Sequence, residues 1–279
     1  MASAGAWPGF APFLSALESA PLATLVGTVA VVAASTGVAY VLVGGRGANG
    51  WGGDPPEHSS RSKLALDKLK DRCSTSYDTG SAAHEERLEA LWEALRPGVR
   101  RSARLTEEWG ELGFQGQDPA TDFRGYGMLG LDNLLYFATG RHGVRMREAV
   151  DGPSWPDDPF GLPVAITGIN LTAKLLDLLR ASPRATAAVF DELFDLHPDA
   201  EDSGDLPEHL VVERFSEVYV HFFIDFLAFH RREVRAYLDR GGAPHLAAMQ
   251  VTQVTEKFYA HHARHAGRRG RLHPALLKR

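Results

Sequence analysis

The stretch "RGYGMLGLDN", residues 124–133, decides the fold, because it contains the Gly-x-Gly-x-x-Gly spacing of a dinucleotide-binding loop. Such a loop follows a buried strand and opens the helix of a βαβ unit. Here the preceding residues, "FQGQDPATDFR", are polar and include Pro119. Asp151 lies at the distance of a ribose-binding acid, but it follows "GVRMREAV", which is no clean strand. The context therefore excludes a Rossmann domain, and we expect the chain to bind neither a nucleotide nor a cofactor itself.

The same stretch is better explained as part of a helix. Thr121 or Asp122 can cap it, and the residues that follow carry apolar side chains on one side. A glycine inside a helix costs roughly 1 kcal/mol relative to alanine, so three glycines need a reason. One candidate is a close crossing of another helix at Gly127 and Gly130, which share a face. The other is an irregular start, with Gly125 bending the backbone beside a functional side chain.

Helical periodicity continues on both sides of this stretch. The clearest segments are "HEERLEALWEALR" (84–96), "NLTAKLLDLLR" (170–180), "SPRATAAVFDELFDLH" (182–197) and "HLVVERFSEVYVHFFIDFLAFHRREVRAYL" (209–238). Charges interrupt the last segment, so we expect one or two core helices there, not a membrane span. No segment shows the alternation of a strand. The sequence predicts a single all-α domain over residues 62–267.

Composition narrows the class of protein. The chain of 279 residues is 44% hydrophobic and 23% charged, which is typical of a globular protein. Its formal net charge is −5, so nothing demands a nucleic acid as partner. Cys73 is the only cysteine, which excludes a disulfide framework. It lies in a polar stretch, and we do not expect it to be reactive.

Residues 22–45 run without a charge, and this length matches the roughly 20 apolar residues that cross a bilayer. The sequence therefore predicts a transmembrane helix there, after a short N-terminal segment, 1–21. The alternatives are a buried core helix, a cleaved signal peptide and a plastid transit peptide. A Gly- and Pro-rich linker, 46–61, follows.

The flanks of the apolar segment predict its orientation. Only Glu18 is charged before it, whereas Lys and Arg follow it at positions 46, 61, 63, 68 and 70. Because the positive flank stays in the cytosol, we expect a single-pass protein of an endomembrane with its helical domain in the cytosol.

A denser pattern surrounds the glycines. Its members are Trp109, Gly113, Phe114, Gln115, Pro119, Thr121, Asp122, Phe123, Arg124, Gly125, Gly127, Leu129, Gly130, Leu131, Asn133, Leu134, Tyr136 and Phe137. This pattern resembles, without a gap, the signature of ELMO-domain proteins of the ELMOD type. "PFGLPVAITGINLTAKLLDLL" is similar to the family's next segment, and the resemblance covers roughly residues 83–265.

The resemblance implies an all-helical domain that activates GTP hydrolysis by Arf and Arf-like small GTPases in their GTP form. It also implies that the arginine of the "DFRG" motif, Arg124, is catalytic. An arginine supplied in trans stabilises charge on the transferred phosphate. We expect Asp122 and Gln115 to hold its guanidinium, and Gly125 and Gly127 to shape the backbone beside it.

Simpler explanations stand beside this one. Arg124 can equally be half of a structural ion pair, and the aromatic members of the pattern can be core residues. The domain can be a non-catalytic adaptor that recruits a GTPase or an exchange factor, or a purely structural domain. His261 and His265 are one helical turn apart, but no further ligand joins them, so we expect no metal. The basic tail, 268–279, is either a solvated end or a contact for anionic lipid.

Overall fold

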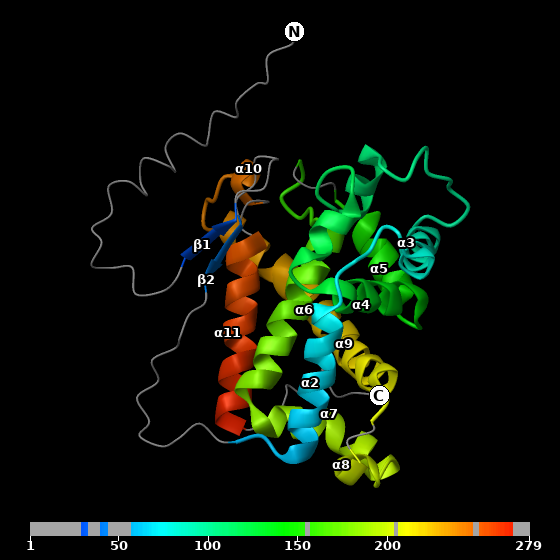
Figure 1. Cartoon of the computed structure of the whole chain (residues 1–279). Helices are drawn as coiled ribbons and strands as arrows, with labels where there is room; N and C mark the ends of the chain where they lie inside the picture. Colours follow the sequence, from blue (N-terminus) through cyan, green and yellow to red (C-terminus); the bar gives the residue numbers. More distant parts are fainter. Residues whose placement is uncertain are drawn as a thin grey trace. The chain divides into compact units, whose positions relative to one another are not determined.

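The computed structural model describes residues 29–32, 40–43, 57–153, 157–203, 206–247 and 251–269. The chain divides into two compact units, Met1–Asp54 and Pro55–Arg279. The described part of the first unit consists of two short strands, and that of the second consists of helices and their connections (Figure 1).

In the first unit, strand β1 (Val29–Val32) pairs antiparallel with strand β2 (Tyr40–Val43). Both strands lie inside segment 22–45, so the prediction of a transmembrane helix there is wrong. The physical reason is that Val and Tyr favour strands. Pairing of the two strands also forms the backbone hydrogen bonds that a helix would otherwise form. In the ranges that the structure describes, no helix is long and apolar enough to cross a membrane. The expected single-pass membrane location is corrected accordingly; the other residues of segment 22–45 lie outside the described ranges.

The second unit is all-helical in its described residues, which confirms the predicted fold class. Its α-helices are α2 (Ser60–Ser74), α3 (Ala82–Leu95), α4 (Gly127–Thr139), α5 (Gly143–Val150), α6 (Val164–Ala181), α7 (Pro183–Leu196), α8 (Ala200–Ser203), α9 (Glu208–Asp239), α10 (Pro244–Ala247) and α11 (Val251–Arg269). Two 3₁₀ helices, η2 (Glu107–Leu112) and η3 (Pro119–Arg124), connect α3 to α4.

Local chemistry explains where several helices begin. The Ser59 hydroxyl accepts the N–H of Ser62 at 3.2 Å and so caps α2, which places the start of this helix inside the predicted linker. Helix α7 starts as its sequence predicts, with Ser182 as the cap and Pro183 in the first turn. The strongly apolar stretch forms one continuous helix, α9, of 32 residues.

Helix α4 is the centre of the unit and packs against α2, α3, α6 and α9 (Figure 1). Its apolar residues from Met128 to Phe137 are buried on nearly every side. The ring of Phe137 packs edge-on against Phe223 of α9, with 5.4 Å between the ring centroids. A helix with apolar side chains on every face must be buried on every face. Helix α4 and the helices packed around it therefore form the core.

The helix that the sequence predicts from Thr121 onward is interrupted. Residues up to Arg124 form η3, and α4 begins only at Gly127. Asp118 caps η3 by accepting the N–H of Ala120 at 3.0 Å, so neither Thr121 nor Asp122 is the cap. The interruption separates the exposed end of η3 from the buried start of α4.

Candidate functional site

Arg124 is the last residue of η3 and is exposed to solvent. Within the described ranges, its guanidinium makes no hydrogen bond and no ion pair. The structure therefore does not support the simpler explanation that Arg124 belongs to an internal salt bridge. Beside it, Gly125 has an ordinary right-handed backbone, and a Cβ there would meet nothing within 4 Å. Both residues are exposed among the described parts of the chain, so a second molecule can reach the guanidinium.

Asp122 and Gln115 contact each other and not Arg124. The Asp122 Oδ2 atom accepts the backbone N–H of Gln115 at 2.8 Å. This bond joins the loop after η2 to η3. The two residues therefore fix the backbone that carries Arg124, and they do not bind its guanidinium. The expectation of direct contacts from these two side chains is corrected to that extent.

Burial is the largest influence on the Asp122 carboxyl and raises its pKa to about 6. The Gln115 N–H and the Arg124 charge lower this pKa, and the Asp118 charge raises it. Among the described residues, the Asp122 carboxyl acts on the Arg124 guanidinium through its charge alone, because its hydrogen bond goes to the Gln115 N–H.

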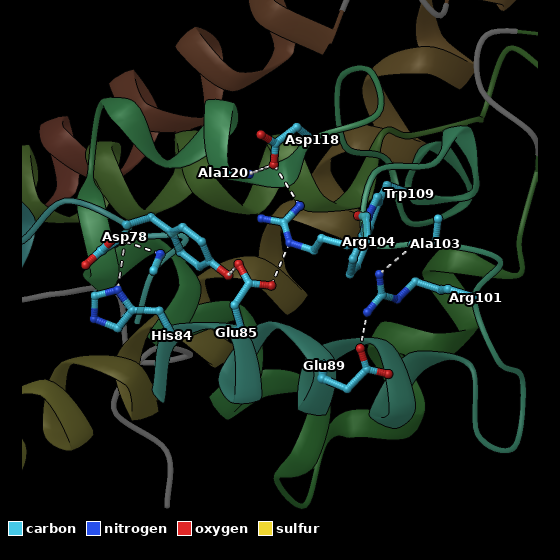
Figure 2. A network of polar contacts seen from close by, with 12 residues as sticks. Asp78, His84, Glu85, Glu89, Arg101, Ala103, Arg104, Trp109, Asp118 and Ala120 are labelled. Atoms are coloured by element: carbon cyan, nitrogen blue, oxygen red, sulfur yellow. Dashed lines mark hydrogen bonds and ion pairs between the residues drawn. The ribbon is translucent and has the colours of Figure 1, made fainter. Parts of the chain in front are cut away.

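The start of η3 is anchored to α3 through Arg104. The Arg104 guanidinium donates to Glu85 at 2.6 Å and to Asp118 at 2.9 Å, and Glu85 also accepts the Tyr77 hydroxyl at 2.8 Å. Figure 2 shows Arg104 between Glu85 and Asp118, the cap of η3. Because three elements meet at one arginine, the position of η3 is determined by the tertiary structure and not by η3 itself. The sequence contains no local signal that pairs these residues.

The underside of η3 is apolar. Phe123, next to Arg124, is buried against the rings of Tyr77 and Phe114 at 5.7 and 5.8 Å. Trp109 is fully buried, packs edge-on against Phe114, and donates its indole N–H to the Arg104 carbonyl at 3.0 Å. These rings hold the chain that leads to Arg124 against the core.

Glycines 113 and 127 are required by close approaches to other backbone. Gly127 has a φ of +47°, and a Cβ there would lie 2.3 Å from the Thr75 carbonyl oxygen at the end of α2. Gly113 has a φ of +85°, and its Cβ would lie 2.3 Å from the Val164 nitrogen. By contrast, a Cβ at Gly130 would make only ordinary contacts, the nearest at 3.5 Å. The irregular backbone expected at Gly125 is thus found at Gly127.

Polar residues of α4 join it to its neighbours. The Asn133 amide donates to Thr172 of α6 at 3.0 Å and accepts the Ser216 hydroxyl of α9 at 2.8 Å. Asp132 accepts Arg72 of α2 at 2.6 Å and also Arg87 of α3. The sequence analysis did not identify this Asp132 cluster. Two further members of the pattern lie nearby: Pro119 is buried in the first turn of η3, and Tyr136 is only half-buried.

Cys73, the histidines and the basic tail are the weaker candidates of the sequence. Burial raises the pKa of the Cys73 thiol to about 11, which disfavours its thiolate. Among the described residues, no group of three or more His, Cys, Asp or Glu side chains could hold a metal ion. The tail beyond residue 269 lies outside the described ranges.

Comparison with known proteins shows which family the chain resembles. A model of the "ELMO/CED-12 family" matches residues 67–241. ELMO domain-containing protein B of Dictyostelium discoideum is 57% identical over 103 residues, which are 37% of this chain and 35% of that protein. Human ELMO domain-containing protein 2 is 35% identical over 150 residues, which are 54% of this chain and 45% of that protein. ELMO domain-containing protein 1 of Bos taurus is 35% identical over 140 residues, with shares of 45% and 41%.

The matched regions thus span less than half the length of these relatives. No solved structure matches the chain.

Proposed function

The chain belongs to the ELMO/CED-12 family, and from this premise we propose that it activates GTP hydrolysis by an Arf or Arf-like small GTPase through Arg124. The GTPase supplies the nucleotide and most of the catalytic groups. Arg124 supplies the missing counter-charge for the transferred phosphate.

The observation that carries this proposal is the exposed guanidinium of Arg124, which the described protein leaves without a hydrogen bond or an ion pair. A guanidinium that is not used internally loses no bond when it enters a partner. The planar fork of an arginine side chain can bind two phosphate oxygens at once. An arginine of this kind raises the rate of hydrolysis by about 10³ to 10⁵, which corresponds to roughly 4 to 7 kcal/mol of barrier.

The support of Arg124 suits such a role. Both ends of η3 are held, by Arg104 at its start and by the buried Phe123 at its end. A catalytic group that is positioned before the partner arrives costs less ordering entropy in the transition state. The side chain is free while its backbone is fixed, which is the combination that a group supplied in trans requires.

The test is single-turnover GTP hydrolysis by a panel of Arf-family GTPases, with the wild-type protein and two variants. We expect Arg124→Ala to reduce the stimulated rate by about 10² or more, because a transition-state charge is lost. Its melting temperature should stay within about 1 °C of the wild type, since the described residues form no bond with the Arg124 side chain. We expect Arg124→Lys to recover little, because one ammonium cannot bridge two oxygens.

Arg145 provides a matched control, because it is also exposed. Arg145→Ala should leave stimulation unchanged. A stable Arg124→Ala protein with full activity would remove Arg124 from the mechanism. Binding of a GTP-loaded GTPase without any stimulation would identify the domain as a non-catalytic adaptor.

A further inference from the structure

A groove of about 740 Å³ opens between α3 and the segment that leads from α3 to η2. One wall carries acidic side chains of α3 and the other carries arginines, and Figure 2 shows Glu85 and Glu89 opposite Arg104 and Arg101. The charged lining consists of Glu85, Glu86, Glu89, Arg100, Arg101 and Arg104.

The groove is preformed, because ion pairs and ring contacts hold its walls. Arg104 bonds to Glu85 across it, and Arg101 pairs with Glu89. The Arg101 guanidinium also lies over the Trp109 ring, 4.2 Å from its centroid, and donates to the Ala103 carbonyl at 3.1 Å. The two walls therefore do not need to be ordered by a partner, which lowers the entropic cost of binding there.

Two charged side chains of the groove are unpaired within the described protein. Neither Glu86 nor Arg100 makes a hydrogen bond or an ion pair through its side chain in the ranges that the structure describes. Val99 and Leu105 keep 51% and 57% of their surface exposed and lie in the same segment as the arginine wall. Val99 precedes Arg100 and Leu105 follows Arg104 in the chain, so both adjoin the charged lining in sequence. Protein–protein interfaces combine an apolar centre with a polar rim.

The groove lies within reach of a molecule that contacts Arg124. Arg104 of the groove bonds to Asp118, which caps η3, and Arg124 is the last of the six residues of this helix. At a rise of about 2 Å per residue, η3 is roughly 12 Å long. A standard protein interface covers about 800 Å² on each partner, which corresponds to a patch roughly 30 Å across. One partner can therefore cover Arg124 and the groove together.

We propose that the groove, with Val99 and Leu105, is a second docking surface for the same GTP-loaded small GTPase. This inference rests on the proposed function for the identity of the partner. The partner presents apolar side chains to Val99 and Leu105, a basic side chain to Glu86 and an acidic one to Arg100. Arg124 contributes to the rate of hydrolysis, and the groove contributes to affinity.

The test separates affinity from rate. Leu105→Asp and Val99→Asp introduce a charge at the apolar part of the surface. We expect each to raise KM for the GTPase by about tenfold, as loss of a central apolar contact does, while kcat stays within about twofold. Val144 and Leu196 are also exposed apolar residues, at 55% and 71%, and provide matched controls. Val144→Asp and Leu196→Asp should change neither parameter.

A charge reversal tests the acidic wall. We expect Glu86→Lys to raise KM by about three- to tenfold at low salt, because it repels the partner's basic side chain. This effect should shrink at high salt, since exposed charges are screened within about a Debye length. An unchanged KM for all three groove variants would overturn the surface.

Direct binding distinguishes failure of this inference from failure of the proposed function. The measurement is titration of each variant with GTPases loaded with a non-hydrolysable GTP analogue. Weaker binding by Leu105→Asp, together with no stimulation by the wild type, would support the surface and overturn the GTPase-activating role. Unchanged binding by Leu105→Asp, together with loss of stimulation in Arg124→Ala, would overturn the surface alone. Absence of binding to every GTPase would overturn both.

Discussion

The residue pattern between Trp109 and Phe137 has two halves, which end in η3 and in α4. The two halves differ in which side chains they expose to solvent. In the first half, Arg124 at the end of η3 and the following Gly125 lie at the surface, and no residue in the described ranges bonds to the Arg124 guanidinium. In the second half, α4 buries most of its side chains, and its buried polar residues Asp132 and Asn133 are bonded to neighbouring helices. The difference teaches that residues of one dense motif serve two purposes. The second half stabilises the fold, and the first half holds a side chain available for a partner.

The boundary between the halves gives the largest expected effect on stability. Gly127→Ala places a Cβ 2.3 Å from the Thr75 carbonyl oxygen at a left-handed backbone position. We expect a loss of about 3 kcal/mol or more of unfolding free energy, because the close backbone contact cannot relax cheaply. Chemical denaturation measures it.

Gly125→Ala is the matched control, two residues away with open space at its Cβ. Its unfolding free energy should change by less than about 1 kcal/mol, with a tendency toward stabilisation. Equal losses of unfolding free energy for the two variants would contradict the distinction between a buried and an exposed half.

A smaller effect is expected at the polar centre of α4. Asn133→Ala removes the bonds to Thr172 and Ser216, whose side chains are buried. We expect a loss of about 2 to 3 kcal/mol, from an unsatisfied buried hydroxyl and a small cavity. Thermal unfolding monitored by circular dichroism measures the change.

Thr139 serves as the control for Asn133, because it lies on the same helix and is exposed. Thr139→Ala should stay within about 0.5 kcal/mol of the wild type. If Asn133→Ala were equally mild, the buried polar contacts of α4 would not contribute to stability as proposed.

The smallest effect is a pH dependence at Asp122. Its folded pKa of about 6 is above the ordinary value of 3.8, so the folded state keeps the proton over this interval. Any cost of the buried carboxylate is absent below pH 4, grows as the pH rises, and is complete above pH 6. Asp122→Asn removes this cost while its side-chain oxygen can still accept the Gln115 N–H. We expect the variant to be more stable by about 1 kcal/mol at pH 7.5 and equal to the wild type near pH 4.

The measurement is the melting temperature of both proteins across this pH range. A difference that is independent of pH would show that the Asp122 carboxyl does not titrate in this window. Asp122 would then behave like an ordinary exposed acid, and the contrast between the exposed η3 and the buried α4 would be stronger.

Local features of the sequence predict much of the helical unit. Apolar residues repeat at helical spacing along α3, α6 and α9, and Ser182 followed by Pro183 marks the start of α7. The family pattern is also local, because its members lie between Trp109 and Phe137. These features depend on residues three or four positions apart, so the sequence by itself determined the helical class, most helix positions and the family.

Only the tertiary structure decided which residues meet and which remain free. Asp132 lies 60 residues from Arg72 and 45 from Arg87, and no local pattern pairs them. Helix periodicity likewise did not predict that η3 ends before α4, because the contact of Gly127 with the end of α2 sets that break. The same holds for the segment that pairs as β1 and β2, where an apolar run is compatible with a helix or a strand. Among the described residues, Asp118 is bonded to Arg104 and Asp122 to the Gln115 N–H, and these pairings depend on packing and not on sequence spacing.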